Sequence, residues 1–571
     1  MAKSKTMTKP RAAKKGKKAT TGTATGSRKV KAAVTSAAGA ADTLGTTPVS
    51  VNPVTSEREP KAQPRTSAQI KSQTQTQTQT KSEAKLINSH QKQAETAALS
   101  PSVAVSAPVA AAPATARPGK SELFARALKA HQTGNIDEAI SLYGAVLRQN
   151  PDQPDVWNNL GVALRRSKRL DASLMAYRRA AELRPGNAGL WSNMGNCLRE
   201  MMRFDEAAAA HAKALELDAS IKSHPFNAGL VYRDTNRFDQ AIAHFDAALA
   251  IDPDYVDANW DKALAQLAMG QFDAGWAGYE TRRKLADNPI RPLESVPEWD
   301  GKTDLRGKRL LLRAEQGFGD MIQFARFVPL VAKKAAHIIL ECRGELIPVM
   351  RTVSGVGTIV EKGAKLPPFD LHVPLLSLPY VLKINAPDLH RISTDPYISA
   401  PKGKQARLSP PAGTVLKVGL IWAGKLNPRD RSCPLELLLP LMAQKGASFY
   451  SFQVDDRRGD IAKLGAGALI TDMGDHIHDF GDSAVLMRDM DLIITIDSAP
   501  AHLAGALGLP VWMLQLYTTD WRWMVNRADS PWYPTMRIYR QLSPGDWQDA
   551  IGYLKQDFDV LLQARLREIL K

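Results

Sequence analysis

A 34-residue interval runs through the middle of this 571-residue chain. Gly161, Gly195 and Gly229 follow one another at that interval, and Ala263 occupies the next step. The same interval separates the members of three further sets: Tyr143, Tyr177, His211, Phe245 and Tyr279; Pro151, Pro185 and, after Ala219 at the next step, Pro253; and the segments NIDEA, RLDAS, RFDEA, RFDQA and QFDAG. A period of this length, with small, aromatic and proline residues at fixed offsets, predicts stacked helix–turn–helix units.

Each repeating unit contains the residues that such a hairpin needs. A small residue lets two helices approach closely, and an aromatic ring such as Tyr177 fills the groove between them. The proline after the second helix ends that helix because it cannot donate the next backbone hydrogen bond. One unit cannot bury its apolar face alone, so about five are expected to stack into a curved solenoid over residues 120–287.

These residues resemble the tetratricopeptide repeat (TPR) family. The resemblance implies an α-solenoid whose concave surface binds a protein acceptor or another protein partner. A solenoid of this kind contributes no chemistry of its own, so any reaction has to be sought in another part of the chain.

The first 119 residues have a different character. Most of the formal net charge of +17 comes from the start of the chain, because residues 1–120 hold 20 Lys and Arg against 5 Asp and Glu. This segment is rich in Ala, Thr, Ser, Gln and Lys and has no aromatic residue. Such a composition predicts disorder, since it cannot bury enough apolar surface to offset chain entropy. The basic cluster Lys14 to Lys18 fits a solvated tail, or one that touches nucleic acid, acidic lipid or an acidic protein.

After the repeats, short apolar runs alternate with helical or loop segments. The strand candidates are Leu310 to Arg313, His337 to Glu341, Thr358 to Val360, Leu371 to Pro374, and the segments that begin at Lys417, Ser448, Ala468, Asp491 and Pro510. The pattern predicts two Rossmann-like α/β halves, residues 288–400 and 414–571, joined by a linker rich in proline. Ligands of such sheets bind beyond the carboxyl ends of the strands.

The first loop of interest at a strand end is Gly317-Phe318-Gly319-Asp320, which precedes a helix-like segment. Its glycines permit close backbone approach, and the helix N-terminus favours negative charge. Asp320 either caps that helix or acts as a base in the cleft between the halves. The loop lacks the third glycine of a dinucleotide-binding fingerprint.

Two further loops carry candidate residues. One contains Lys425, Arg431 and Ser432, whose cations suit a diphosphate or, alternatively, belong to an ordinary basic surface loop. The other runs from Asp497 through Ser498 and Ala499 to His502, where free N–H groups of a helix would face a phosphate. Gly505 and Gly508 follow as small residues on a crowded helix. His502 is either structural or a neutral hydrogen-bond donor beside the strand-end Asp497.

The segments DSAPAHLAGALGLPVW, RAEQGFGDMIQFARFVPL and TTDWRWMVNRADSPWYPTMRIYRQ together resemble the glycosyltransferase family 9, or heptosyltransferase-like, domain. That resemblance implies the GT-B fold over about 300–571, with a final helix, Trp547 to Leu570, that crosses back to the first half. It implies Asp320 as the general base. It implies donor and phosphate contacts from Gly317, Gly319, Lys425, Arg431, Ser432, Asp497, Ser498, Ala499, His502 and Arg522, with Trp521 or Trp523 either beside the donor or in the core.

No cofactor is expected, because the nucleotide sugar is a substrate, and the resemblance implies no metal. Asp475, His476 and His478 are interpreted as a polar loop rather than metal ligands. Asp489 and Asp491 form a DxD pattern that is interpreted as the start of a strand. Cys197, Cys342 and Cys433 lie far apart, no apolar run is long enough to span a membrane, and no signal-peptide core is present, which together indicate a cytoplasmic protein.

Three functions fit these observations. The first is an inverting, metal-independent glycosyltransferase that acts on a protein recruited by the repeats, as in bacterial flagellin glycosylation. The second is a TPR scaffold whose glycosyltransferase-like domain is degenerate. The third, nucleic-acid binding, rests on the basic tail alone and is the least favoured, since interleaved aromatics and a recognised module are missing.

Overall fold

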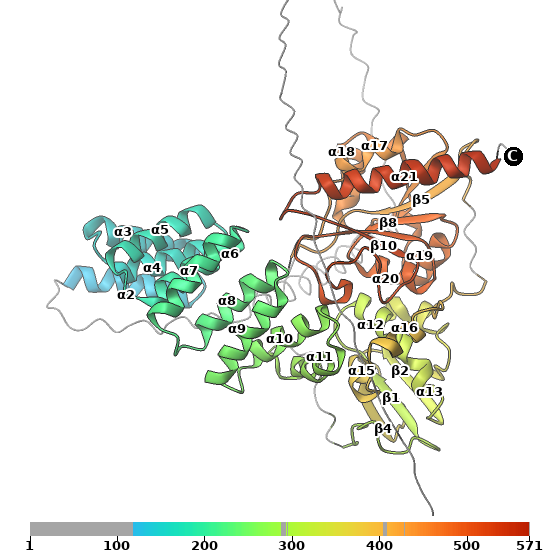
Figure 1. Ribbon diagram of the computed structural model, residues 1–571, viewed down its shortest axis with the longest axis horizontal. Helices are drawn as coiled ribbons and strands as arrows, with labels where there is room; N and C mark the ends of the chain where they lie inside the picture. The colour runs from blue at the N-terminus through green and yellow to red at the C-terminus, as the bar shows by residue number, and fades with distance from the viewer. Residues whose placement is uncertain are drawn as a thin grey trace, which may run out of the picture. The chain divides into compact units, whose positions relative to one another are not determined.

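A computed structural model of the chain describes residues 118–286, 290, 293, 295–403, 408–426 and 429–569, all within one of the two units into which the chain divides. Residues 1–117 of the predicted tail, with the cluster Lys14 to Lys18, lie outside the described residues, whereas Pro118 and Gly119 already belong to the first described helix. The repeat region consists of consecutive helix pairs (Figure 1): α2 (Pro118–Gln132) with α3 (Ile136–Gln149), α4 (Pro154–Arg166) with α5 (Leu170–Leu183), α6 (Ala188–Glu200) with α7 (Phe204–Leu217), α8 (Ser223–Asp234) with α9 (Phe238–Ile251), and α10 (Val256–Ala268) with α11 (Phe272–Tyr279).

The glycines of the period lie directly against the aromatic-type residues of the same repeat, as predicted. A Cβ atom added to Gly161 would lie 2.7 Å from the ring of Tyr177, and one added to Gly229 would lie 2.6 Å from the ring of Phe245. Gly195 faces His211 in the same way, at 2.6 Å from Nε2. Any larger residue at these glycines would push the two helices of a pair apart.

The turn inside each pair also repeats every 34 residues. Its central residue has a left-handed backbone in all five repeats, at Gly134, Lys168, Met202, Asn236 and Gly270, with φ between 58° and 82°. Only the first and last are glycines, so the turn conformation is imposed on ordinary residues by the packing of the helices. Between repeats, polar pairs 35 residues apart connect successive first helices, for example Arg165 to Glu200 at 2.9 Å and Arg199 to Asp234 at 2.9 Å.

The first α/β half contains one parallel sheet in the order β3-β2-β1-β4. Its strands are β1 (Arg309–Arg313), β2 (His337–Cys342), β3 (Thr358–Glu361) and β4 (Leu371–Pro374), at the predicted positions. Its helices are short, and several of them have a proline in the first turn: α12 (Phe318–Phe324), α13 (Val328–Ala332), α14 (Ile347–Met350), α15 (Leu378–Val381) and α16 (Ala386–Ile392). The helix-like segment after the glycine loop is therefore divided between α12, the 3₁₀ turn η2 (Ala325–Phe327) and α13.

The second α/β half contains a six-stranded parallel sheet in the order β10-β9-β8-β5-β6-β7. Its elements are β5 (Leu416–Ile421), α17 (Leu439–Met442), β6 (Ala447–Ser451), α18 (Asp460–Lys463), β7 (Ile470–Asp472), α19 (Phe480–Met487), β8 (Leu492–Ile496), α20 (Ala499–Ala506), β9 (Val511–Gln515), β10 (Met536–Arg540) and α21 (Gln548–Ile569). By order of appearance this is the doubly wound arrangement 6-5-4-1-2-3, whose strand order reverses between β5 and β8. Strand β10 is not among the strands predicted from the sequence.

The last helix does not cross back to the first half, contrary to the expectation drawn from the GT-B resemblance. Ala550, Leu554, Phe558 and Leu562 recur every four residues on one face of α21 and pack into the core of the second sheet. The ring of Phe558 lies 5.9 Å from that of Phe449 on β6. The apolar face of α21 is thus buried against the sheet of the same half, and α21 covers that sheet.

The last repeats are joined to both α/β halves. On the first half, Arg282 in the turn η1 (Glu280–Lys284) makes a buried two-pronged ion pair with Glu315 at 2.7 and 3.0 Å. On the second half, the Asn236 side chain donates to Tyr517 O at 2.6 Å and accepts from Thr519 N at 2.9 Å. The positions of these repeats are thus fixed relative to both sheets by hydrogen bonds as well as by apolar packing.

Candidate functional site

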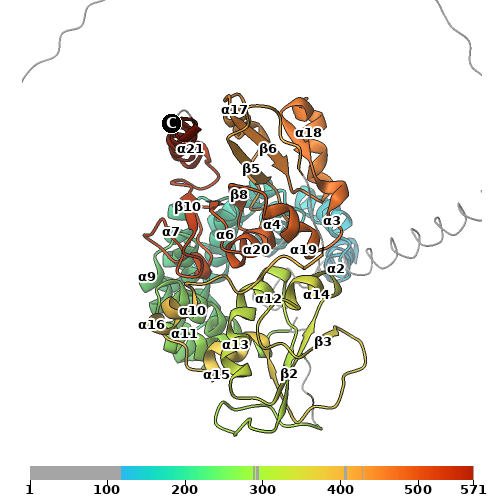
Figure 2. The same cartoon turned by 90° about the vertical axis from the view of Figure 1, so that its right-hand side faces the viewer.

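The candidate site lies where strand-end loops of the two halves meet. Helix α12 begins after β1, and helix α20 begins after β8, at the reversal point of the second sheet; the two helices pack against each other (Figure 2). A Cβ added to Gly319 would lie 2.8 Å from Cδ2 of His502 and 3.6 Å from Cα of Ala499. Gly319 therefore allows the close approach that the sequence indicated, and the partner is protein backbone and a histidine ring.

Asp320 serves as a helix cap and as one member of an ion pair. Its Oδ2 accepts from the backbone N–H of Gly317 at 2.9 Å, which is the capping role weighed from the sequence. Its Oδ1 accepts from Arg522, 202 residues away. The carboxylate is 19% exposed and the guanidinium 12% exposed, so the pair borders on solvent without being open to it.

Arg522 is held from several sides. Nε donates to Gln323 Oε1 at 2.8 Å, Nη1 donates to Asp520 at 3.0 Å, and the guanidinium lies 4.4 Å above the ring of Trp521. Burial opposes its charge, but the carboxylates of Asp520 and Asp320 more than compensate, and the pKa of Arg522 lies above its usual value. Trp521 and Trp523 are both buried in the core, which is the structural alternative considered for them.

Asp497 and Arg431 form a second ion pair, between the loop after β8 and the loop after β5, where the strand order of the second sheet reverses. Arg431 Nη1 donates to Asp497 Oδ2 at 3.1 Å. Burial raises the pKa of the Asp497 carboxyl, and the Arg431 guanidinium opposes part of that shift. Ser432 Oγ accepts from Gly424 N at 3.3 Å and thereby closes the same loop, while Lys425 is exposed.

The start of α20 offers fewer backbone donors than a free helix N-terminus. Ser498 is the N-cap in extended conformation, and its side chain does not cap the helix. Ala499 follows at the first helical position, and Pro500 in the second position has no N–H. A ligand would find the N–H groups beside Ser498 and Ala499, and additional charge neutralisation would have to come from arginine side chains.

His502 lies one turn into α20 and is almost completely buried. Its Nδ1 is 2.9 Å from the Tyr533 hydroxyl, and its ring stacks on that of Trp523 with centroids 5.1 Å apart. Burial lowers the pKa of His502 well below its usual value, and the charges of Arg522, Arg326 and Arg431 lower it further. The ring is therefore neutral at pH 7.

Several residues at this junction were missed by sequence reasoning. Arg326 donates to Trp532 O at 2.7 Å and to Ser393 at 2.9 Å, and its guanidinium lies 4.8 Å from the rings of both Tyr397 and Tyr533. Tyr533 and Gln323 were also overlooked as individual residues. The signal available was that Arg326 and Tyr533 occur inside two of the three quoted segments that resemble the glycosyltransferase family.

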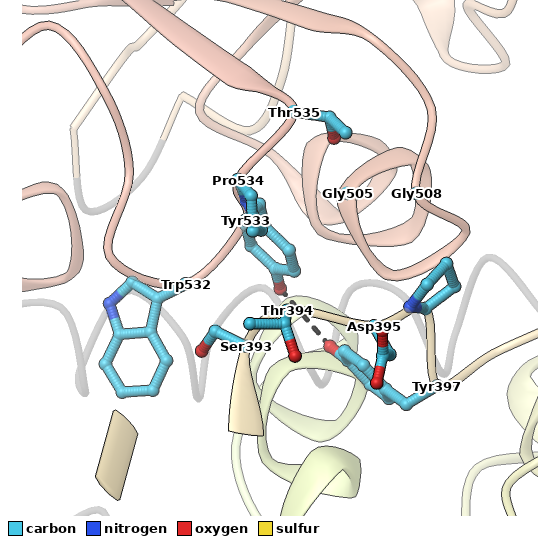
Figure 3. Close-up of a pocket in the computed structure, with 11 residues that line it drawn as sticks. Ser393, Thr394, Asp395, Tyr397, Gly505, Gly508, Trp532, Tyr533, Pro534 and Thr535 are labelled. Carbon is cyan, nitrogen blue, oxygen red and sulfur yellow. Dashed lines mark hydrogen bonds between the residues drawn. The ribbon is translucent and has the colours of Figure 1, made fainter. Parts of the chain in front are cut away.

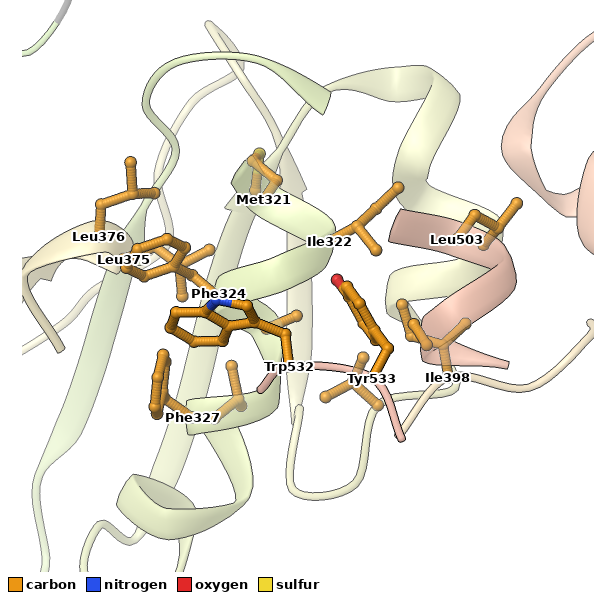
Figure 4. Close-up of a cluster of buried hydrophobic side chains, with 14 of the residues drawn as sticks. Met321, Ile322, Phe324, Phe327, Leu375, Leu376, Ile398, Leu503, Trp532 and Tyr533 are labelled. Carbon is orange, nitrogen blue, oxygen red and sulfur yellow. The ribbon is translucent and has the colours of Figure 1, made fainter. Parts of the chain in front are cut away.

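The two halves share one apolar core behind the polar residues. Figure 4 shows Leu503, Trp532 and Tyr533 of the second half in the same cluster as Ile322 and Phe324 of α12. A small cavity of about 80 Å³ opens next to this cluster, lined by Tyr397, Gly505, Gly508 and Tyr533 among others (Figure 3). Gly505 is required there, because a Cβ would lie 2.5 Å from the Tyr533 ring.

Two of the remaining acidic candidates have structural partners. Asp475 pairs with Arg458 at 2.8 Å, and Asp491 accepts from Lys417 N at 2.8 Å immediately before β8, as its interpretation as the start of a strand predicts. Within the described ranges no group of three or more His, Cys, Asp or Glu residues could hold a metal ion. Cys197, Cys342 and Cys433 are free thiols in buried positions. Among the described helices, none is both long and apolar enough to span a membrane.

Fold and site define a TPR array followed by a parallel-sheet α/β region. Residues 124–188 match the tetratricopeptide repeat family and residues 229–270 match the TPR repeat family. The chain is 28% identical over 323 residues to Protein FlbA of Caulobacter vibrioides (strain ATCC 19089 / CIP 103742 / CB 15). The match covers 51% of this chain and 53% of FlbA. The chain thus spans about half the length of this curated relative.

Two solved structures are similar to part of the chain. MamA is 18% identical, covers 30% of this chain and 98% of its own, and has a TM-score of 0.27. A tetratricopeptide repeat protein from Parabacteroides merdae is 20% identical, covers 30% of this chain and 73% of its own, and has a TM-score of 0.27.

Proposed function

We propose that the chain is an inverting glycosyltransferase that moves a sugar from a nucleotide donor to a protein held by the TPR array. The observation that carries the proposal is the junction of α12 and α20, where Gly319 contacts His502 and Asp320 pairs with Arg522. A sugar-nucleotide reaction needs a base and groups that stabilise negative charge. The first half supplies a carboxylate, and the second half supplies cations and the N-terminus of a helix.

In this proposal Asp320 accepts the proton of the acceptor hydroxyl as that oxygen attacks the anomeric carbon. The new bond forms on the face opposite the breaking bond to the diphosphate, so the configuration inverts. Negative charge then develops on the leaving diphosphate. Arg431 and Lys425, together with the start of α20, would stabilise it in place of a metal ion. Because Arg522 occupies one Asp320 oxygen, the acceptor would have to share or displace that contact.

The TPR array is a protein-interaction scaffold, and we propose that it recruits the acceptor. Since the last repeats are bonded to both halves, an acceptor on the solenoid would be held at a fixed place relative to the cleft. Glycosylation of a flagellin-type protein fits this arrangement. The alternative, a scaffold with an inactive α/β region, is favoured by one observation: both Asp320 oxygens already accept hydrogen bonds within the protein.

A donor screen followed by one pair of variants separates these functions. Thermal shift of the full chain with UDP-, GDP-, ADP- and CMP-linked sugars, with and without EDTA, is expected to give one nucleotide-specific rise in Tm that EDTA leaves intact. Asp320→Asn should then lower transfer by about 100- to 10,000-fold while the nucleotide shift persists.

The matched control is Asp388→Asn. Asp388 accepts from the N-cap N–H of α16 just as Asp320 does on α12, yet it lies outside the proposed site. Equal transfer by wild type and Asp320→Asn would remove Asp320 as the base. No shift with any nucleotide sugar would favour the scaffold.

A further inference from the structure

Two tyrosine hydroxyls and one arginine lie in a chain that ends on His502. Tyr533 Oη is 2.9 Å from His502 Nδ1 and 3.5 Å from Tyr397 Oη. Tyr397 Oη in turn lies 2.9 Å from the carbonyl oxygen of Ile322 and accepts from Arg326 Nη2 at 3.2 Å. Figure 3 shows the two tyrosines pointing toward each other from the linker and from the loop before β10.

Counting hydrogens decides how this chain is oriented. A phenol has one hydrogen, and a carbonyl oxygen can only accept, so the Tyr397 hydrogen is used at Ile322 O. Tyr533 is then left with two possible acceptors. O–H donors prefer separations of about 2.5–3.0 Å. The His502 nitrogen is within that range and the Tyr397 oxygen is not, so Tyr533 donates to His502 Nδ1.

A neutral imidazole that accepts at Nδ1 carries its hydrogen at Nε2. The surroundings keep the ring neutral. It is buried against Trp523, and the charges that face it are the cations Arg522, Arg326 and Arg431, from the turn η9 (Trp521–Trp523), from η2 and from the loop after β5. Burial, reinforced by these cations, depresses the pKa of the imidazolium.

The opposite edge of the ring faces the junction of the two halves. A Cβ on Gly319 would lie 3.4 Å from Nε2, so only glycine leaves this edge unobstructed. His502 Nε2 has no hydrogen-bond partner among the described residues. Unlike Trp523 Nε1, which is also without a partner there, this atom is not fully buried. A hydrogen at Nε2 is thus available to a molecule that enters beside Gly319.

We propose that Tyr533 is a positioning residue that fixes His502 in the Nε2–H form, so that His502 acts as an uncharged hydrogen-bond donor to an anionic oxygen beside Gly319. The tautomer itself depends only on the protein contacts described here. The identity of the acceptor oxygen, that of a nucleoside diphosphate, rests on the proposed function. In this arrangement His502 is not a general base, because neither ring nitrogen has a free lone pair.

The tautomer is tested by NMR of the full chain with ¹⁵N-labelled histidine, using His502→Gln to identify the His502 signals. We expect Nε2 to be protonated and Nδ1 to be unprotonated from pH 8 to pH 5.5. In Tyr533→Phe the two tautomers should become mixed, whereas Tyr397→Phe should leave the spectrum of His502 unchanged. A protonated Nδ1 in the wild type, or titration of the ring near pH 6.5, would overturn the proposal.

The role of His502 as a hydrogen-bond donor is tested by calorimetric titration with UDP, GDP, ADP and CMP. Gln presents an amide nitrogen near the place of Nε2, whereas the shorter Asn does not reach it. His502→Gln should therefore bind the preferred nucleotide close to wild-type affinity, and His502→Asn should bind it about 3- to 10-fold more weakly.

Equal affinity of His502→Asn and wild type would refute the donor role. Failure of every nucleotide to bind the wild type would count against the proposed function and against nucleotide as the ligand, while the tautomer result would stand on its own.

Discussion

His211 fills the inter-helix position that Tyr143, Tyr177, Phe245 and Tyr279 fill in the other repeats, and it is completely buried. Neither of its ring nitrogens has a hydrogen-bond partner among the described residues. One of those nitrogens carries a hydrogen and the other a lone pair, and each unpaired buried group costs about 1–3 kcal/mol. We predict that His211→Phe stabilises the third repeat, because Phe245 shows that a phenyl ring fits against the glycine of this position.

The size of the effect depends on pH. Burial, reinforced by the charge of Arg199, lowers the pKa of His211 to about 3. Since the folded pKa lies below the unfolded value of about 6.5, the unfolded chain binds the proton first as the pH falls. The part of the wild-type free energy of unfolding that depends on a neutral His211 is therefore fully present above pH 6.5 and is lost progressively toward pH 3. From pH 7 to pH 5 the loss is about 2 kcal/mol, or about 30-fold in the opening equilibrium.

Hydrogen exchange of peptides from α6 and α7 measures that opening locally, after correction for the intrinsic effect of pH on exchange. Wild type should lose about 30-fold in protection between pH 7 and pH 5 beyond what His211→Phe loses. Tyr177→Phe is the control, because it removes an unpartnered buried hydroxyl at the equivalent site that does not titrate in this range. Equal pH dependence in wild type and His211→Phe would refute the reasoning.

Three further outcomes are expected. Arg282→Ala strands the buried Glu315 carboxylate and should lower the free energy of unfolding by about 3–5 kcal/mol, whereas Arg306→Ala, which breaks an exposed pair, should leave the denaturation midpoint unchanged. Asn236→Gly keeps the left-handed turn but loses both hydrogen bonds to the second half, so proteolysis between the repeats and that half should accelerate. Gly505→Ala should displace the Tyr533 ring and lower the melting temperature, and an unchanged melting temperature would contradict the close packing of α20.

The repeats were predictable because their determinants are local. Each glycine and its ring partner are 16 residues apart within one hairpin, so a single repeat already contains both sides of the contact. The buried strands were predictable for a similar reason, since a short apolar run between turn residues identifies them without knowledge of their neighbours. The strand β10 was missed because Arg537 and Arg540 interrupt the apolar run that begins at Met536.

The residues of the site were predicted as strand-end loops, but their partners were not. Asp320 and Arg522 were both candidates, yet nothing in their surroundings signals that they pair across 202 residues. Similarly, the sequence shows that α21 has an apolar face. Which of the two sheets it packs against depends on which face of each sheet is already covered by other elements. The last repeat and the turn after it contact the first half, through Trp276 on Phe324 of α12 and Arg282 on Glu315, and α21 lies on the second sheet.

By itself the sequence determined the helical hairpins, nine of the ten strands in the described part of the chain and the loops that carry charge, because periodicity and apolar runs act over a few residues. Only the tertiary structure decided which charges meet, where α21 packs and which nitrogen of His502 carries the hydrogen. Those features depend on contacts between segments far apart in the chain, and their geometry, down to a few tenths of an ångström between two tyrosine hydroxyls and a histidine, is set by packing rather than by local pattern.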